Sequence, residues 1–186
     1  MKTLTSLPAV ETPQLVLREI ELRDTTAFTG FMTQEAYQRH IAMRLANEAE
    51  VRAFVTRSVA RQGDERRNVF HLAAEEKSSG EAVGDGFIIV QRPKLLEIGW
   101  GVHPAMWSMG LGTEIGRALL GLCFERLKAE RVWCKAMAAN VASGRIAKRI
   151  GMRHFQSHPD YPAGGGRSTP VDIFALQAPE YFDLAY

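Results

Sequence analysis

The fold of this 186-residue chain is decided by the stretch from Glu97 to Glu114, which reads EIGWGVHPAMWSMGLGTE. A strand that holds two glycines runs through a turn marked by Pro104 into a Gly-x-Gly loop that opens a helix. Gly110 and Gly112 let the backbone approach a ligand closely, and the N–H groups of the first helical turn lack partners within the helix. Because the helix dipole adds about half a positive charge there, the stretch predicts a binding site for a phosphate or pyrophosphate.

Two nucleotide-binding motifs fail on their spacing. A P-loop needs a lysine at the start of the helix, whereas Gly112 is followed by Thr113 and Glu114. A dinucleotide fingerprint needs its third glycine three residues after the second, whereas Gly116 comes four residues after Gly112. By itself, the loop is equally compatible with a tight turn whose glycines serve helix packing.

The sequence up to Val102 predicts four strands, because apolar and polar residues alternate there with a period of two. The strands span residues 14–20, 69–74, 82–91 and 95–102. The last three are joined by short links and should therefore pair antiparallel. Two helices separate the first strand from the second. One begins after Asp24, and the other begins after Asn47, with Glu50 as its capping-box partner.

After Gly112 the apolar pattern becomes helical as far as Lys128 and is followed by a strand over residues 131–138. A helix over 141–150 ends at Gly151, and two late strands cover 152–157 and 171–176. Because a helical crossover joins strand 95–102 to strand 131–138, that pair should be parallel. The fold class is therefore α/β (α+β), with a mixed, mostly antiparallel sheet of six to seven strands flanked by helices.

Length and composition favour one globular domain over residues 1–186. The chain has 46% hydrophobic and 24% charged residues, as ordinary globular proteins do. A net charge of +2 is too small for nucleic acid to be the main partner. We find no membrane span, no secretory signal and no metal-ligand spacing among the histidines and cysteines, and we expect a cytoplasmic protein. Cys123 and Cys134 should be buried, reduced thiols, and the charged run 61–67 should be a solvated loop.

The whole order of segments resembles the GNAT acyltransferase superfamily over about residues 14 to 176. The superfamily signature is Gln/Arg-x-x-Gly-x-Gly/Ala, and the run from Trp107 to Gly112 resembles the variant with Trp first in the ribosomal-protein N-terminal (Rim-type) acetyltransferases. The runs 15–18, 97–100, 140–143 and 148–152 resemble further segments of that subgroup. Each short motif is weak alone, but their order and spacing together are specific.

This resemblance implies that acetyl-CoA binds in a wedge between strands 95–102 and 131–138, the fourth and fifth, which splay apart beyond a bulge. Gly99 and Gly101 suit a bulge or a close backbone approach. In this fold the pantetheine arm pairs with backbone near Gly101 and Val102, and the pyrophosphate rests on amides from Met109 to Thr113. Asn140 contacts the pantetheine or caps the next helix, and Trp107 packs under the loop. The cofactor-binding candidates are Gly101, Val102, Trp107, Met109, Gly110, Leu111, Gly112, Thr113 and Asn140.

Acyl transfer to an amine requires a base, a polarised thioester carbonyl and a proton for the leaving thiolate. Glu97 is the candidate base, because it stands on the strand just before the expected bulge, where partial burial raises a carboxyl pKa; the alternative is a solvated strand-edge carboxylate. The N–H of Val102 is a candidate for holding the carbonyl oxygen. The resemblance implies a Tyr at position 147 that would protonate the thiolate, but this chain has Ala147 there. Ser143 matches the residue that usually replaces this acid in the subgroup. The alternative is that Ser143 is an ordinary residue of the first helical turn.

We therefore expect an enzyme that moves acetyl from acetyl-CoA to a primary amine by direct attack in a ternary complex. The acceptor, a protein N-terminus or a small-molecule amine, stays open, as does the choice between monomer and homodimer. Tyr161 or Arg167, in the glycine-rich loop between the last strands, are candidates for contacting the acceptor. The alternative function is a non-catalytic CoA-binding module of the same fold.

Overall fold

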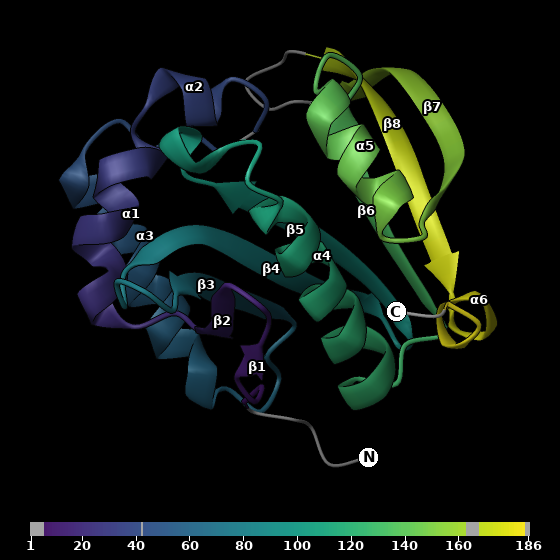
Figure 1. Ribbon diagram of the computed structural model, residues 1–186, viewed down its shortest axis with the longest axis horizontal. Helices are drawn as coiled ribbons and strands as arrows, with labels where there is room; N and C mark the ends of the chain where they lie inside the picture. Colours follow the sequence, from purple (N-terminus) through teal and green to yellow (C-terminus); the bar gives the residue numbers. More distant parts are fainter. Residues whose placement is uncertain (1–5, 42, 163–167, 185–186) are drawn as a thin grey trace.

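The computed structural model describes residues 6–41, 43–162 and 168–184, which form one mixed eight-stranded sheet with helices on both faces (Figure 1). The strand order is β1-β2-β3-β4-β5-β6-β8-β7. The strands are β1 (Val10–Glu11), β2 (Leu15–Glu19), β3 (Val69–Glu76), β4 (Ala82–Arg92), β5 (Leu95–Val102), β6 (Arg131–Met137), β7 (Arg153–Pro162) and β8 (Ser168–Gln177). The α-helices are α1 (Thr25–Met32), α2 (Glu35–Gln38), α3 (Glu48–Ala60), α4 (Leu111–Gly121), α5 (Val141–Arg149) and α6 (Ala178–Phe182).

The sheet is antiparallel except between β5 and β6, which pair in parallel as the helical crossover predicted. The fold class is confirmed, with one strand more than the six to seven expected. The additional strand, β1, is only two residues long, so it has no alternation to detect. The short helices α2 and α6 were missed for the same reason, since four or five residues show no helical period.

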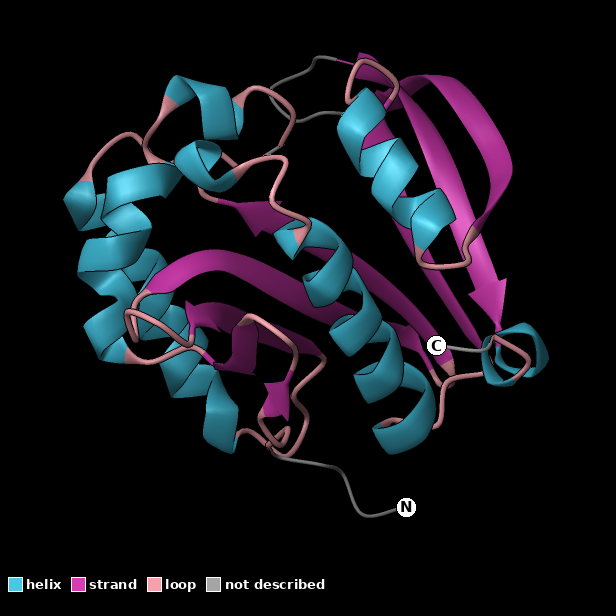
Figure 2. Ribbon diagram, viewed as in Figure 1, coloured by secondary structure: helices cyan, strands magenta, loops and turns pink. Residues whose placement is uncertain are grey.

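Two helix layers enclose the sheet, and each packs on its own apolar cluster. On one face, Leu96 and Ile98 of β5 join a core with Ile115 and Leu119 of α4. Figure 2 shows α4 and α5 crossing in front of the strands on this face. On the other face, α1 and α3 pack around Phe28, Phe31 and Phe54 in a second cluster. None of the described helices is long and apolar enough to cross a membrane.

Strands β5 and β6 splay apart, as the resemblance implied. They pair at three positions, of which Glu97 with Trp133 is the last, although β5 runs on to Val102 and β6 to Met137. The expected bulge in β5 is wrong, because β5 keeps continuous register with β4 from Leu96 to Val102. The strands part because β5 stays paired with β4 whereas β6 stays paired with β8.

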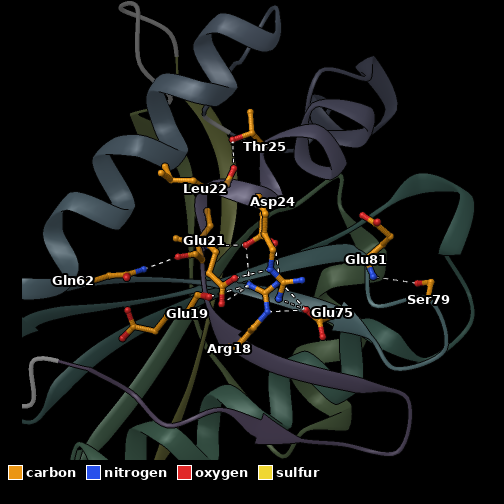
Figure 3. A network of polar contacts seen from close by, with 12 residues as sticks. Arg18, Glu19, Glu21, Leu22, Asp24, Thr25, Gln62, Glu75, Ser79 and Glu81 are labelled. Carbon is orange, nitrogen blue, oxygen red and sulfur yellow. Dashed lines mark hydrogen bonds and ion pairs between the residues drawn. The ribbon is translucent and has the colours of Figure 1, made fainter.

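The start of α1 is held by ion pairs rather than by a side-chain cap. Asp24 stands at the N-cap position as expected, but its carboxylate accepts two hydrogen bonds from the Arg18 guanidinium, at 2.8 and 2.7 Å, and one from the N–H of Glu21 (Figure 3). Arg18 also donates to Glu75 at 2.8 Å. These partners raise the pKa of Arg18 above its usual range, led by Asp24.

The prediction that the charged run 61–67 is a solvated loop is wrong for Arg67. Its side chain is buried, lies 2.8 Å from Glu19 and stacks 4.4 Å above the Phe70 ring. An arginine presents a planar, weakly hydrated cation that tolerates burial when it is paired and stacked. The sequence could not show this, because Glu19 and Arg67 are distant along the chain.

Candidate active site

The loop before α4 presents a row of free backbone donors. Within the part of the chain that the structure describes, the amides of residues 108–112 donate no hydrogen bond, and Thr113, expected in the same set, donates to the Gly110 carbonyl. Ser108 and Gly110 have positive φ angles, 66° and 85°. Successive amides in such turned backbone, at the start of a long helix, form a concave site for an anion. The geometry therefore fits the phosphate-binding loop that the sequence predicted.

The two loop glycines are required for different reasons. A Cβ on Gly110 would meet open space, and the positive φ of this residue is what favours glycine there. A Cβ on Gly112 would lie 2.7 Å from Cδ1 of Ile146 on α5. Gly112 thus lets α4 and α5 pack closely, which is the helix-packing role that the sequence had left open.

Trp107 does not pack under the loop, and that expectation is wrong. The indole is 51% exposed, and its Nε1 donates to the carbonyl of Val102 at 2.9 Å. Because the residue precedes the positive-φ turn at Ser108, the chain carries the ring outward rather than beneath the loop. Trp107 therefore ties the loop to the end of β5.

The open edge of β5 faces the gap left by β6. The N–H of His103 donates to Val83 on β4, so the alternating residues Gly101 and Gly99 also turn their backbone groups toward β4. The backbone N–H and C=O groups of the intervening residues therefore point toward the gap. These residues are Ile98, Trp100 and Val102. Val102 lies on the edge as expected, whereas Gly101 does not present its backbone there.

A cavity of about 320 Å³ opens at this gap. Its lining brings together Glu97 from β5, and Asn140 and Ser143 from the start of α5. Trp100 also lines it, and its Nε1 is the buried side-chain polar atom that finds no hydrogen-bond partner within the described chain. Since buried donors are nearly always paired, this orphan N–H indicates that a ligand acceptor belongs beside it.

Glu97 is buried and ion-paired, rather than the solvated strand-edge carboxylate that was the alternative. Only 2% of the residue is exposed. Oε1 accepts from Nζ of Lys135 on β6 at 2.7 Å, and Oε2 accepts from Nε2 of Gln91 at 2.7 Å. The ammonium of Lys135 also lies 5.5 Å from the rings of Trp133 and Tyr161. The pair spans the splayed strands at the floor of the cavity.

At the start of α5, Asn140 and Ser143 combine a capping role with a place in the cavity wall. The Asn140 side chain accepts from the N–H of Ser143 at 3.2 Å, so it is the N-cap of α5. The Ser143 hydroxyl makes no hydrogen bond to a described residue and is free to donate into the cavity. Ala147 is fully buried in the core and does not line the cavity.

Sequence analysis missed several polar residues that line the cavity, Tyr37 and Asp85 among them. Tyr37 of α2 donates its hydroxyl hydrogen bond to Oδ1 of Asp85 on β4. Burial raises the pKa of Asp85 to about 6 and also raises that of Tyr37. The available signal was Asp85 between two glycines, Gly84 and Gly86, in an otherwise apolar strand.

His71 of β3, which also lines the cavity, lies between Phe54 and Phe87, with ring centroids 4.9 and 6.5 Å away. Burial, assisted by the charges of Arg61 and Arg67, lowers its pKa to about 4. The imidazole is therefore neutral at pH 7.

Tyr161, the candidate for contacting the acceptor, lines the cavity from β7. Arg167 and the glycines 164–166 lie outside the described residues. No cluster of three or more His, Cys, Asp or Glu side chains suited to a metal ion occurs in the ranges that the structure covers.

Cys123 and Cys134 are free and buried, as predicted. Burial raises the pKa of the Cys134 thiol to about 12, with the charge of Glu97 adding to it, and raises that of Cys123 further. Since the thiolate is the nucleophilic form, neither cysteine is reactive at neutral pH.

Comparisons with known proteins agree with this architecture. The family model of the acetyltransferase (GNAT) domain matches residues 14–153. An uncharacterised N-acetyltransferase of Bacillus subtilis, YoaA, is 22% identical over 174 residues, which is 92% of this chain and 98% of the relative. The chain therefore belongs to the GNAT acetyltransferase family and is an acetyltransferase.

Solved structures show the same fold. An acetyltransferase of the GNAT family from Bacillus anthracis superposes with a TM-score of 0.82 at 19% identity, over 92% of this chain and 99% of the other. RimL, a ribosomal L7/L12 α-N-protein acetyltransferase solved with coenzyme A, superposes with a TM-score of 0.79 at 17% identity, over 91% and 98%.

Proposed function

We propose that the chain transfers acetyl from acetyl-CoA to a primary amine by direct attack in a ternary complex. The observation that carries this proposal is the cavity at the splay of β5 and β6, which Glu97 lines from β5 and Ser143 lines from α5. The free amides of residues 108–112 lie at the entrance to α4, beyond the end of β5.

Acetyl-CoA is the substrate that fits these donors. The diphosphate would accept from the amides of Met109, Gly110, Leu111 and Gly112, with Thr113 completing the first turn of α4. The amide-bearing pantetheine arm would pair with the gap-facing edge of β5 at Val102 and Trp100, and Asn140 would contact it from α5. The orphan indole N–H of Trp100 supports this assignment, because the arm carries carbonyl acceptors.

In the reaction, the amine nitrogen attacks the carbonyl carbon of the thioester, and the carbon–sulfur bond breaks. Glu97 accepts the proton that the amine loses, directly or through a water molecule. The N–H of Val102 donates to the carbonyl oxygen as negative charge develops. Ser143 protonates the departing thiolate. The products are an N-acetylated amine and free CoA.

A covalent acetyl-enzyme has no support in this site. Cys134, which lines the cavity, has its pKa raised to about 12, so it does not provide a thiolate at neutral pH. Within the family, we propose the Rim-type subgroup, on the run from Trp107 to Gly112 and on the likeness to RimL.

The test combines calorimetry with CoA and a thiol-release assay with acetyl-CoA and a panel of primary amines. We expect CoA to bind and at least one amine to release CoA thiol in proportion to acetylated product. Binding of CoA without turnover on any amine would favour a non-catalytic CoA-binding module. Absence of CoA binding would contradict both functions.

A further inference from the structure

A cluster of polar side chains joins the turn between β1 and β2 to the first turn of α4. It consists of Thr12, Gln14 and Glu114, none of which takes part in the acyl transfer. Resting on the proposed function, in which the loop 108–112 binds the diphosphate of CoA, we propose that Gln14 and Glu114 are positioning residues for that loop. They aim its amides at the anion without contacting CoA themselves.

The side-chain amide of Gln14 holds one peptide group of the loop. Its Nε2 donates to the carbonyl of Met109 at 3.4 Å and to Oε1 of Glu114 at 2.7 Å. The Met109 carbonyl and the Gly110 N–H belong to the same peptide group, which is trans and planar. Because C=O and N–H point in opposite directions in such a group, the bond from Gln14 directs the Gly110 N–H away from Gln14. That side of the loop is where the diphosphate would bind.

The carboxylate of Glu114 keeps Gln14 in place. The bond from Gln14 to Met109 is long, so the shorter bond to Glu114 decides where the amide stays. Oε2 of Glu114 also accepts from the backbone N–H of Gln14 at 3.1 Å and from Oγ1 of Thr12 at 2.5 Å. Partial burial acts to raise the pKa of Glu114, but these hydrogen bonds lower it overall, so the group is ionised at neutral pH.

The turn that carries Thr12 and Gln14 is anchored to the sheet. The N–H of Thr12 donates to the carbonyl of Leu15 at 2.9 Å, and the N–H of Lys77 donates to the carbonyl of Gln14 at 3.0 Å. Leu15 begins β2 and is completely buried. A group that positions a binding loop needs such a fixed base, since a mobile partner would move with the loop.

The charge of Glu114 distinguishes a positioning role from a purely electrostatic one. A carboxylate in the first turn of α4 repels a diphosphate bound at the start of that helix. Loss of the charge alone would therefore strengthen CoA binding. Positioning predicts the opposite sign, because loss of the carboxylate frees Gln14 and lets the peptide groups of the loop rotate out of the anion-binding arrangement.

The experiment separates binding of CoA from turnover. Calorimetry with CoA gives Kd, and thiol release from acetyl-CoA with a primary amine that the parent chain acetylates gives kcat and KM. We expect Glu114→Ala to raise Kd and KM about tenfold and Gln14→Ala about threefold. The kcat at saturating acetyl-CoA should change less than about twofold, since the reacting groups stay in place. Because both residues act through one network, the double variant should bind CoA about as weakly as Glu114→Ala alone.

Two further variants separate positioning from loss of the fold. Glu114→Gln keeps the shape and one acceptor oxygen, but its amide nitrogen does not accept from Nε2 of Gln14, so Kd should rise about threefold. Glu48→Ala removes an exposed carboxylate from the first turn of α3 and is the matched control, which should leave Kd unchanged. If Glu114→Ala does not fold, Glu114→Gln and the exposed substitution Gln14→Ala still test the role.

The outcomes distinguish this proposal from the proposed function. If the parent chain binds CoA, a Kd that the substitutions at Glu114 lower or leave unchanged would overturn the positioning role and keep the CoA site. A fall in kcat as large as the rise in Kd would also overturn it, because that pattern indicates general damage to the protein. Absence of CoA binding by the parent chain would contradict the proposed function and the positioning role together.

Discussion

The ammonium of Lys135 on β6 lies 2.7 Å from Oε1 of Glu97 on β5, at the level where the two strands stop pairing. The ion pair therefore bridges the splayed strands at the floor of the cavity. The Glu97 carboxylate is buried, whereas the Lys135 side chain is 37% exposed. Removing the lysine would leave a buried anion with only Gln91 as a partner among the described residues.

Lys135→Met should consequently lower both stability and turnover. We expect a loss of about 1–2 kcal/mol in the free energy of unfolding, less than for a fully buried pair because Lys135 is partly solvated. Denaturant unfolding and thiol-release rates measure the two effects, and Lys135→Arg should restore most of both. Lys77→Met removes a surface partner of Glu11 and should cost under about 0.5 kcal/mol. Equal losses for the two methionine variants would contradict this role.

Glu97→Gln should reduce turnover while leaving CoA affinity nearly unchanged. The amide has the shape of the carboxylate but does not accept a proton, so we expect kcat to fall about 100-fold. Calorimetry with CoA and thiol-release kinetics report the two quantities separately. Glu130→Gln, an exposed carboxylate paired with Lys94, is the control. An unaltered rate at neutral pH would remove Glu97 as the base.

Gly112→Ala should destabilise the protein by contact with α5. The added Cβ meets Cδ1 of Ile146, and overpacking of this kind costs about 1–3 kcal/mol. Ile146→Val removes that methyl group, so the double variant should recover much of the loss. Thermal unfolding of the single and double variants measures the coupling. Simple additivity of the two changes would show that the contact with Ile146 is not the cause.

Gly110→Ala tests the other loop glycine. A Cβ there meets no atom, but the residue has φ +85°, a conformation that costs an alanine roughly 1–2 kcal/mol. The loop would relax out of its anion-binding shape, so we expect CoA affinity to fall about tenfold with little change in the packing of α4. Calorimetry with CoA measures this, and Gly63→Ala, at the end of a short 3-10 helix with open space and no positive φ, is the control. Undiminished affinity would contradict the phosphate-loop assignment.

His71 should make the protein less stable in acid. Burial lowers its pKa from 6.5 to about 4, so between these pH values the unfolded chain binds a proton that the folded chain excludes. Stability therefore falls as pH falls through this window. The raised pKa of Asp85, about 6, acts in the opposite direction, because there the folded chain binds the extra proton.

The comparison of His71→Phe with the parent chain isolates the contribution of the histidine to the pH dependence of stability. We expect the difference in unfolding free energy, variant minus parent, to increase by about 2 kcal/mol between pH 7 and pH 4.5. Urea unfolding at both pH values measures it. Phe54→Leu alters the same aromatic cluster without a titrating group, so its difference should be independent of pH. A constant difference for His71→Phe would contradict a buried neutral imidazole.

Much of the fold was accessible from the sequence because it depends on local periodicity. Alternation placed β5 at its observed bounds, and the crossover through α4 correctly implied the parallel pairing with β6. The capping pattern at Asn47 identified α3, where the Asn47 side chain accepts from the N–H of Glu50. The Gly-x-Gly loop likewise indicated a site for an anion, because unpaired amides are a property of every helix start.

The contacts that shape the cavity were decided by the tertiary structure alone. The residues around Arg67 in the sequence do not predict its ion pair with Glu19. Those around Asp85 do not predict its hydrogen bond with Tyr37, which lies 48 residues away. The small size of Gly101 is understandable only once that pair is placed above it. Periodicity specifies which face of an element is buried. The contacts between side chains of distant elements depend on how those elements pack, and short-range sequence patterns do not determine that packing.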